Sequence, residues 1–217
     1  MIIRMKTSAC IVALVLCVFT LAGCGGASNT VSTTPSTTAA PATTQPASAS
    51  TEQPVPVSSG AQVTGSDIPD TQVFVTYASS QGKYGLEVPE GWAQSASGIE
   101  VSFVNNLDGL QVALTSAATQ PTASSVRTGQ AVTLQQTSRA VQDVKVQDVH
   151  LASGPAVLIT YTSNSDPNAV TGKQVRLENN RYLFFKNGKL VTLTLSAPVG
   201  ADNVDQWLRI ANSFRWG

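Results

Sequence analysis

Few residues of this 217-residue chain could take part in nucleophilic or acid–base chemistry. The sequence contains one histidine, His150, and three cysteines, Cys10, Cys17 and Cys24. A Ser-His-Asp or Cys-His arrangement would have to use His150, and no Gly-x-Ser-x-Gly motif accompanies it. We therefore interpret His150 as a partly exposed residue at the end of a strand, and the sequence predicts no catalytic residue.

Metal and cofactor binding are not predicted either. A structural zinc site needs about four Cys or His ligands, and His150 would be the only one left if Cys10 and Cys17 are removed and Cys24 is lipidated, as the amino-terminal residues predict below. Asp166-Pro167-Asn168 is only faintly similar to a calcium loop, because Val170 and Thr171 occupy the positions of a ligand and of the glycine. Gly172-Lys173 lacks the upstream glycine of a phosphate-binding loop. We interpret residues 166–168 as a turn.

Pairs of neighbouring carboxylates could act as acid and base. On predicted turns, alternating strands and a helix start, such groups are far more often solvated charges or helix caps. We therefore assign none of them a catalytic role. The pairs are Glu87 with Glu90, Asp143 with Asp148, and Asp202 with Asp205.

The amino-terminal residues have the order of parts found in a signal peptide. Arg4 and Lys6 precede an apolar run over residues 9–21, interrupted only by Thr20, and Leu21-Ala22-Gly23-Cys24 follows. The run is shorter than the ~20 residues that span a bilayer permanently. The four-residue motif resembles the lipobox of bacterial lipoproteins, which implies cleavage between Gly23 and Cys24 and attachment of lipid to the Cys24 thiol. An ordinary secretory signal and a retained membrane anchor are the alternatives.

These features predict a location and a state of the cysteines. Residues 1–23 would be removed, and two or three acyl chains, each buried methylene contributing about 0.8 kcal/mol, would hold Cys24 in a membrane. The remaining chain would face the extracytoplasmic side of the cell envelope. Cys10 and Cys17 would leave with the signal peptide, so no disulfide could form within one mature chain.

Residues 24–69 are predicted to be the lipidated cysteine and a disordered linker. From Gly25 to Ser66 the chain is almost entirely Ser, Thr, Ala, Pro, Gly and Gln, and Glu52 is its only charged residue. Such a segment cannot bury enough apolar surface to offset the entropy of ordering its backbone. As a flexible coil it would have a mean reach of roughly 35 Å.

Residues 70–217 are predicted to form one globular domain. Apolar residues alternate with polar ones in several segments, which indicates half-buried strands with inward stripes. Two further strands are expected over residues 173–178 and 181–186, joined by a turn at Asn179-Asn180. Asn187-Gly188 predicts a type I′ hairpin leading to a strand over residues 190–195. The other expected strands cover residues 73–77, 84–88, 99–103, 110–114, 144–151 and 156–162.

Two helices complete the expected domain. The first is capped by Thr122 and extends to about residue 138, with Val126 and Leu134 inward and Gly129 weakening it. The second begins at Asp202 as N-cap, with an apolar face that must cover a sheet. That face consists of Val204, Trp207, Leu208, Ala211 and Phe214. Strands joined by short turns and two separated helices predict an α+β domain with an antiparallel sheet.

Three segments resemble the PsbP-like fold, an antiparallel β-sheet sandwiched by helices that is shared by the photosystem II extrinsic subunit, a Ran-binding import factor and many bacterial lipoproteins. They are Tyr84 to Trp92, the Lys186-Asn187-Gly188-Lys189 hairpin, and the ending Asn212 to Trp216. The resemblance implies an architecture and no photosynthetic function. Trp92, Trp207 and Trp216 are expected to pack in the core.

Charge gives a weak indication of a binding surface. The 13 basic and 13 acidic residues balance, and loss of Arg4 and Lys6 would leave a slight acidic excess, so no affinity for nucleic acid is expected. A basic face on neighbouring strands could contact an anionic partner, although an ordinary solvated strand face is the simpler interpretation. Its members would be Lys173, Arg176, Arg181, Lys186 and Lys189.

The sequence therefore favours a noncatalytic binding or accessory domain, anchored to a membrane through lipid on Cys24 and contacting another envelope protein or complex. No cofactor is expected. The alternative is an envelope hydrolase or a small-ligand carrier, whose site would be a deep, closed cleft with buried convergent carboxylates. An open or shallow surface would favour the binding domain.

Overall fold

The computed structural model describes residues 52–57 and 66–217 of the chain. The predicted signal peptide, Cys24 and most of the predicted linker lie outside these residues. Within the described ranges, no helix has the length and apolar character needed to cross a bilayer.

The described part of the chain contains one large antiparallel sheet, here called the main sheet. Its strands are β3 Ala93–Ser97, β4 Glu100–Asn105, β5 Asp108–Ser116, β6 Gln142–Leu151, β7 Gly154–Asn164, β8 Arg176–Lys186 and β9 Lys189–Pro198. They lie in the order β3-β4-β5-β9-β8-β7-β6. Every neighbouring pair is antiparallel, as the sequence predicts.

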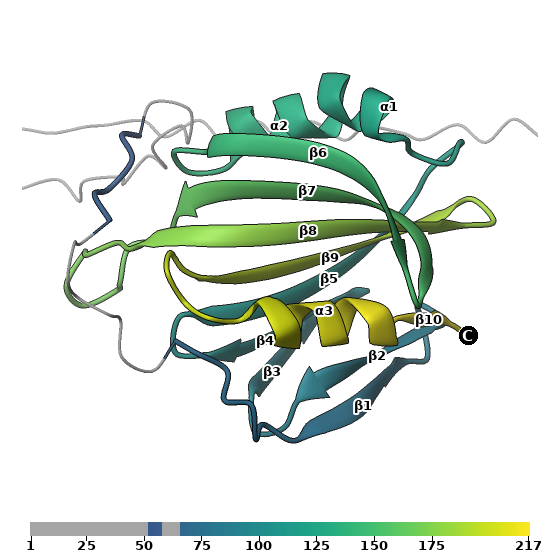
Figure 1. Ribbon diagram of the computed structural model, residues 1–217, viewed down its shortest axis with the longest axis horizontal. Coiled ribbons are helices and arrows are strands. Elements are labelled where there is room, and N and C mark those ends of the chain that lie inside the picture. Colours follow the sequence, from purple (N-terminus) through teal and green to yellow (C-terminus); the bar gives the residue numbers. More distant parts are fainter. Residues whose placement is uncertain (1–51, 58–65) are drawn as a thin grey trace, which may run out of the picture. The chain divides into compact units, whose positions relative to one another are not determined.

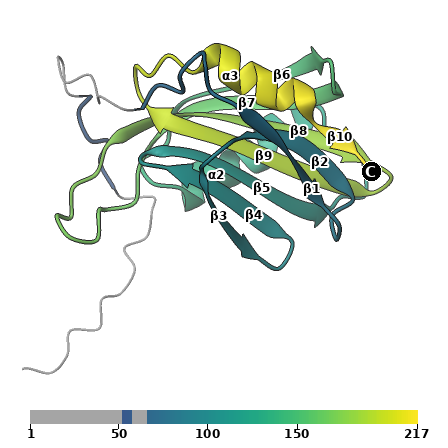
Figure 2. The same cartoon turned by 90° about the horizontal axis from the view of Figure 1, so that it is seen from below.

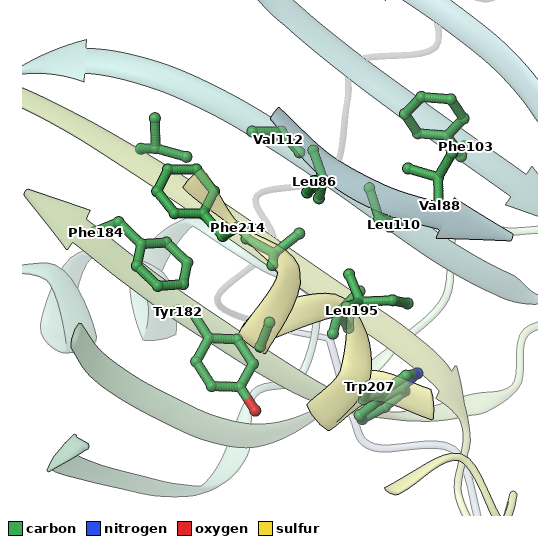
Figure 3. Packing of buried hydrophobic residues seen from close by; sticks show 14 of the residues in the cluster. Leu86, Val88, Phe103, Leu110, Val112, Tyr182, Phe184, Leu195, Trp207 and Phe214 are labelled. Atoms are coloured by element: carbon green, nitrogen blue, oxygen red, sulfur yellow. The ribbon is translucent and has the colours of Figure 1, made fainter. Parts of the chain in front are cut away.

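A small sheet and a helix cover one face of the main sheet (Figure 1). The small sheet has the order β1-β2-β10, and its strands are β1 Phe74–Ser79, β2 Tyr84–Pro89 and β10 Arg215–Trp216. The helix is α3, Val204–Ser213. Figure 3 shows the resulting core, in which the Phe214 ring stacks on Phe184 with centroids 4.1 Å apart. Trp207 is buried there, and Trp92 and Trp216 pack against the same cluster.

Two short helices cover part of the opposite face, so the main sheet is sandwiched between helices (Figure 2). They are α1, Ala123–Thr128, and α2, Gln130–Thr137. Val126 and Leu134 pack against β6 and β7 in a second core that includes Ile159 and Leu183. The predicted α+β class, with an antiparallel sheet between helices, is confirmed.

Several local predictions are confirmed. Thr122 caps α1, because its hydroxyl accepts a hydrogen bond from the Ser125 backbone N–H. Asn187 and Gly188 have φ angles of 51° and 76°, as a type I′ hairpin requires. Gly129 does more than weaken the predicted helix, however, since it separates α1 from α2.

The predicted turn at Asn179-Asn180 is wrong. Both residues lie inside β8, which pairs with β7 and β9 through this region. The Asn179 side chain is buried and donates a hydrogen bond to the Ser163 hydroxyl, so its amide is satisfied within a strand. Lys173 precedes β8 and belongs to no strand.

The predicted burial of some apolar side chains is also wrong. Val204 and Leu208 are 69% and 44% exposed, because α3 begins after Asn203 and presents Trp207 and Ile210 to the core instead. Asp202 is not the N-cap residue. Val73 and Val75 are exposed at the outer edge of the small sheet, and β3 and β10 were not predicted.

Asn203 attaches the segment before β1 to the domain. Its side-chain oxygen accepts a hydrogen bond from the Ile68 backbone N–H, and its amide nitrogen donates to the Ser66 carbonyl oxygen. Ser66 and Ile68 are buried, although the sequence assigned both to the linker. The same amide nitrogen donates to the Asp108 carboxylate, which is only 2% exposed.

We predict that Asp108 makes stability depend on pH. Burial raises the pKa of its carboxyl from 3.8 to about 7, against the opposing hydrogen bond from Asn203. Because the folded protein binds this proton more tightly than the unfolded chain, the free energy of unfolding should fall as pH rises from about 4 to about 7. Asp108→Asn should remove roughly 1–3 kcal/mol of that dependence.

Urea denaturation at several pH values measures this effect. Glu100→Gln, which changes an exposed carboxylate on β4, serves as the control and should keep the wild-type pH dependence. An unchanged pH dependence in Asp108→Asn would show that this carboxyl is not the source.

Candidate functional site

A groove of about 570 Å³ lies on the part of the main sheet that α1 and α2 leave uncovered. Its lining comes from β4, β5, β9, β8 and β7, together with the end of α2 and the loop after β7. The opposite sides of these strands carry core residues such as Phe103, Leu195 and Phe184. The alternation of strand side chains therefore turns polar residues into the groove.

A row of four polar side chains crosses the groove on adjacent strands. Ser102 on β4 is paired with Gln111 on β5, Gln111 with Thr194 on β9, and Thr194 with Arg181 on β8. Adjacent strands are about 4.8 Å apart, so this polar row extends over roughly 14 Å. It offers hydroxyl, amide and guanidinium groups to a ligand.

Arg181 contributes the positive charge of the polar row. Its Nε donates to the Thr194 hydroxyl over 3.2 Å, and its guanidinium carbon lies 5.7 Å from the centre of the Tyr161 ring. Burial raises the pKa of the Tyr161 hydroxyl, and the nearby guanidinium partly opposes that change. The Tyr161 hydroxyl is therefore neutral at physiological pH.

The groove contains no pair of carboxylates among its described lining residues. Asp166 is the only acidic residue that lines it, and its side chain is 94% exposed. Two of the carboxylates considered in the sequence have structural contacts elsewhere: Glu87 forms an ion pair with Arg209, and Asp148 accepts a hydrogen bond from the Ala123 backbone N–H. General acid–base chemistry has no evident carboxylate pair here.

At the edge of the groove, the segment 52–57 is attached through a cluster of four side chains that we call the clasp. It consists of Glu52 from the segment itself and of Arg139, Asn164 and Gln174 from the rest of the domain. The Glu52 carboxylate pairs with Arg139 over 2.7 Å and accepts hydrogen bonds from Asn164 and Gln174. Burial alone would raise the pKa of Glu52, but these hydrogen bonds and the Arg139 charge lower it overall. Glu52, the only charged residue between Gly25 and Ser66, is thus fixed to the domain.

Asn164 joins the clasp to a buried arginine. Its side-chain oxygen accepts hydrogen bonds from the Val55 backbone N–H and from Arg176 Nη1, at 3.0 and 3.1 Å. Arg176 also donates to Ala140, Gln142 and Thr162. The guanidinium therefore has four acceptors, all of them uncharged, and its role is structural.

The five predicted basic residues do not form one face. Arg176 is buried, and Arg181 is five positions further along β8, so its side chain lies on the opposite side of the sheet. Lys186 and Lys189 pair at the hairpin end of β8 and β9, and Lys173 lies beyond the other end of β8. Of the five, only Arg181 lines the groove.

The remaining singled-out residues lie apart from the groove. His150 is exposed near the end of β6, beside a smaller hollow of about 230 Å³. Residues 166–168 form part of a loop in which the Asn168 side chain accepts hydrogen bonds from the Val170 and Thr171 backbone N–H groups. In the described ranges, no cluster of His, Cys, Asp and Glu could hold a metal ion.

No protein-family model and no curated protein matches the chain in sequence. Among solved structures, the cyanobacterial PsbP of Synechocystis is similar with a TM-score of 0.49 and 17% identity, over 70% of this chain and 98% of that one. A Bacteroides thetaiotaomicron protein has a TM-score of 0.46 and 8% identity, over 65% and 48% of the two chains. The Saccharomyces cerevisiae Ran-binding protein Mog1p has a TM-score of 0.43 and 10% identity, over 66% of this chain and 95% of that one. These are similarities of fold, and no binding property is transferred from them.

The sequence indicated the polar row only in part. The alternation Leu193-Thr194-Leu195-Ser196 shows that one side of this strand is polar. It does not show that Thr194 lies between Gln111 and Arg181, because that alignment depends on pairing between segments far apart in the chain. The signal for the polar row that the sequence did offer is the alternation of polar residues with buried ones on several strands.

We predict that breaking the clasp releases the segment 52–57. Glu52→Ala should increase hydrogen exchange of the Val55 amide roughly 5–30-fold at neutral pH, corresponding to about 1–2 kcal/mol. In the wild type, protection of this amide should be lost as pH falls below 4.5 toward the depressed Glu52 pKa. Glu90→Ala, which removes an exposed carboxylate, is the control. Unchanged Val55 protection in Glu52→Ala would contradict the clasp.

Proposed function

We propose that the chain is a lipid-anchored, noncatalytic binding domain of the cell envelope that contacts another envelope protein or complex through the groove. The observation that carries this proposal is the form of the groove: it is open, it is lined mainly by neutral hydrogen-bonding side chains, and its only described acidic residue, Asp166, is at the solvent-exposed edge. Such a surface suits recognition better than acid–base chemistry.

The proposed anchor rests on the sequence. Leu21-Ala22-Gly23-Cys24 follows an apolar run of signal-peptide length, and lipid on Cys24 would keep the domain at a membrane surface. The clasp supports a related point, since the segment 52–57 is attached to the domain. The groove lies next to this attachment, because Arg139 and Asn164 belong to both.

A small-ligand carrier is the second candidate. The groove volume of about 570 Å³ falls within the range of roughly 300–1,000 Å³ that is usual for small-molecule sites. A carrier would bind a free polar molecule where the first proposal has a protein segment. The two candidate functions are distinguished by whether crosslinking from the groove captures a second protein.

We predict that Cys24→Ala separates the protein from membranes. The wild-type protein should be recovered in the membrane fraction and should incorporate labelled fatty acid, whereas the variant should incorporate none and lose most of its membrane association. Cell fractionation and fatty-acid labelling measure these effects. Equal membrane recovery without label in either protein would contradict the anchor.

We also predict that the groove is the surface that contacts a partner. A photoreactive residue at Gln111 should give a crosslinked protein in intact cells, because Gln111 is an exposed member of the polar row. A photoreactive residue at Asp205, which is exposed on α3 across the main sheet, is the matched control and should not give that product. Identical products from both positions would argue against the groove as the specific site.

A further inference from the structure

We propose that the groove binds a carboxylate group through the guanidinium of Arg181, with the neighbouring side chains of the polar row contacting the rest of the ligand. This inference rests on the proposed binding function and specifies the chemistry that the site would recognise. The carboxylate could belong to an acidic side chain of a partner protein or to a free organic acid.

The first argument is that Arg181 has no acidic partner in the protein. All 13 acidic residues of the chain lie in its described part, and none of them forms an ion pair with Arg181. The guanidinium is nevertheless partly buried in the groove. Removing a charge from water without an opposite charge is unfavourable, so an anion that enters the groove would gain a strong interaction.

The second argument comes from the two other arginines at this end of the main sheet. Arg139 is paired with both Glu52 and Asp166, so its charge is already matched. Arg176 is buried and has four neutral acceptors. Arg181 differs from both, because it lines the groove and its hydrogen bond to Thr194 involves a neutral hydroxyl.

The number of charges favours a carboxylate over a phosphate. Arg139 and Arg181 are the two cations that line the groove among its described residues, and only Arg181 lacks an acidic partner. One available guanidinium matches the single charge of a carboxylate, whose two oxygens fit its planar fork. A phosphate carries up to two charges near neutral pH and would favour a second free cation.

The rest of the polar row suits a ligand with its own hydrogen-bonding groups. Gln111 is exposed, and Ser102 and Thr194 are partly exposed along the row. Their amide and hydroxyl groups both donate and accept hydrogen bonds, so they can contact peptide groups or the hydroxyls of an organic acid. The ligand class is therefore a polar molecule or segment that carries one carboxylate.

Nuclear magnetic resonance titration of the full chain, purified in detergent, tests this inference. The probes are the capped peptide Ser-Glu-Ser, its Ser-Gln-Ser counterpart, sodium gluconate and inorganic phosphate. We expect saturable shifts of the Arg181 Nε–H signal and of the Thr194 and Gln111 amide signals with a carboxylate probe, and at least tenfold weaker binding of the glutamine peptide.

Variants make the test specific. Arg181→Gln should reduce binding of the carboxylate probe at least tenfold, and Arg181→Lys, which keeps the charge but lacks the planar fork, should reduce it several-fold. Lys189→Gln removes an exposed charge at the hairpin end of β9 and should bind like the wild type. Urea denaturation of each variant checks that it is folded.

The probes also distinguish the source of the carboxylate. Stronger binding of the glutamate peptide would identify a protein segment, and stronger binding of gluconate would identify a free organic acid; both support the inference. Equal binding of the two peptides without binding of gluconate, stronger binding of phosphate, no shift with either carboxylate probe, or unchanged carboxylate binding in Arg181→Gln would overturn it. Crosslinking from Gln111 can still succeed in those cases, so failure of the carboxylate inference is distinguishable from failure of the proposed function.

Discussion

The packing of α3 and the small sheet across one face of the main sheet determines what the other face can do. Phe184 and Leu193 are buried in that contact with Phe214, and the strands that supply Phe184 and Leu193 must present their alternate side chains on the opposite side. On β7 and the β6 edge, α1 and α2 cover those alternate positions with a second core. Over β4, β5 and β9 they do not, and most of the side chains there are polar.

Because α1 and α2 cover only part of this face, a groove forms without any unusual backbone conformation. A strand with one apolar and one polar side is ordinary when the polar side faces water. Here the end of α2 and the loop after β7 rise beside that polar side, and a solvated sheet surface becomes a groove lined on several sides. The position of Arg181 follows from the same alternation, because its neighbours Tyr182 and Asn180 have their side chains on the face that packs against α3.

Local sequence signals predicted the elements whose geometry depends on neighbouring residues. Asn187-Gly188 adopts the positive φ angles of its hairpin, and Thr122 caps its helix, because both depend only on nearby backbone. At Asn179 the same residue type led to the prediction of a turn, which is wrong. Asparagine there satisfies its amide against Ser163 on the adjacent strand, a contact that cannot be inferred before the strands are paired.

The alignment of the polar row and the convergence of the clasp could not be predicted from the sequence, for a related physical reason. Each is formed by residues that come together only through long-range pairing, and a shift of one residue in that pairing would turn every side chain to the other face. Glu52 was recognised as the only charge in a low-complexity segment, but composition gave no sign that Arg139, Asn164 and Gln174 would converge on it. The average character of a segment does not exclude one residue with specific partners.

Two asparagine side chains attach the chain that precedes the domain, and they change the geometry expected for the proposed tether. Asn203 binds the backbone at Ser66 and Ile68, and Asn164 binds it at Gln53 and Val55. The tether would therefore end near Glu52 and not near residue 70. Because the clasp shares Arg139 and Asn164 with the groove, the groove lies beside the place where the segment 52–57 is attached to the domain.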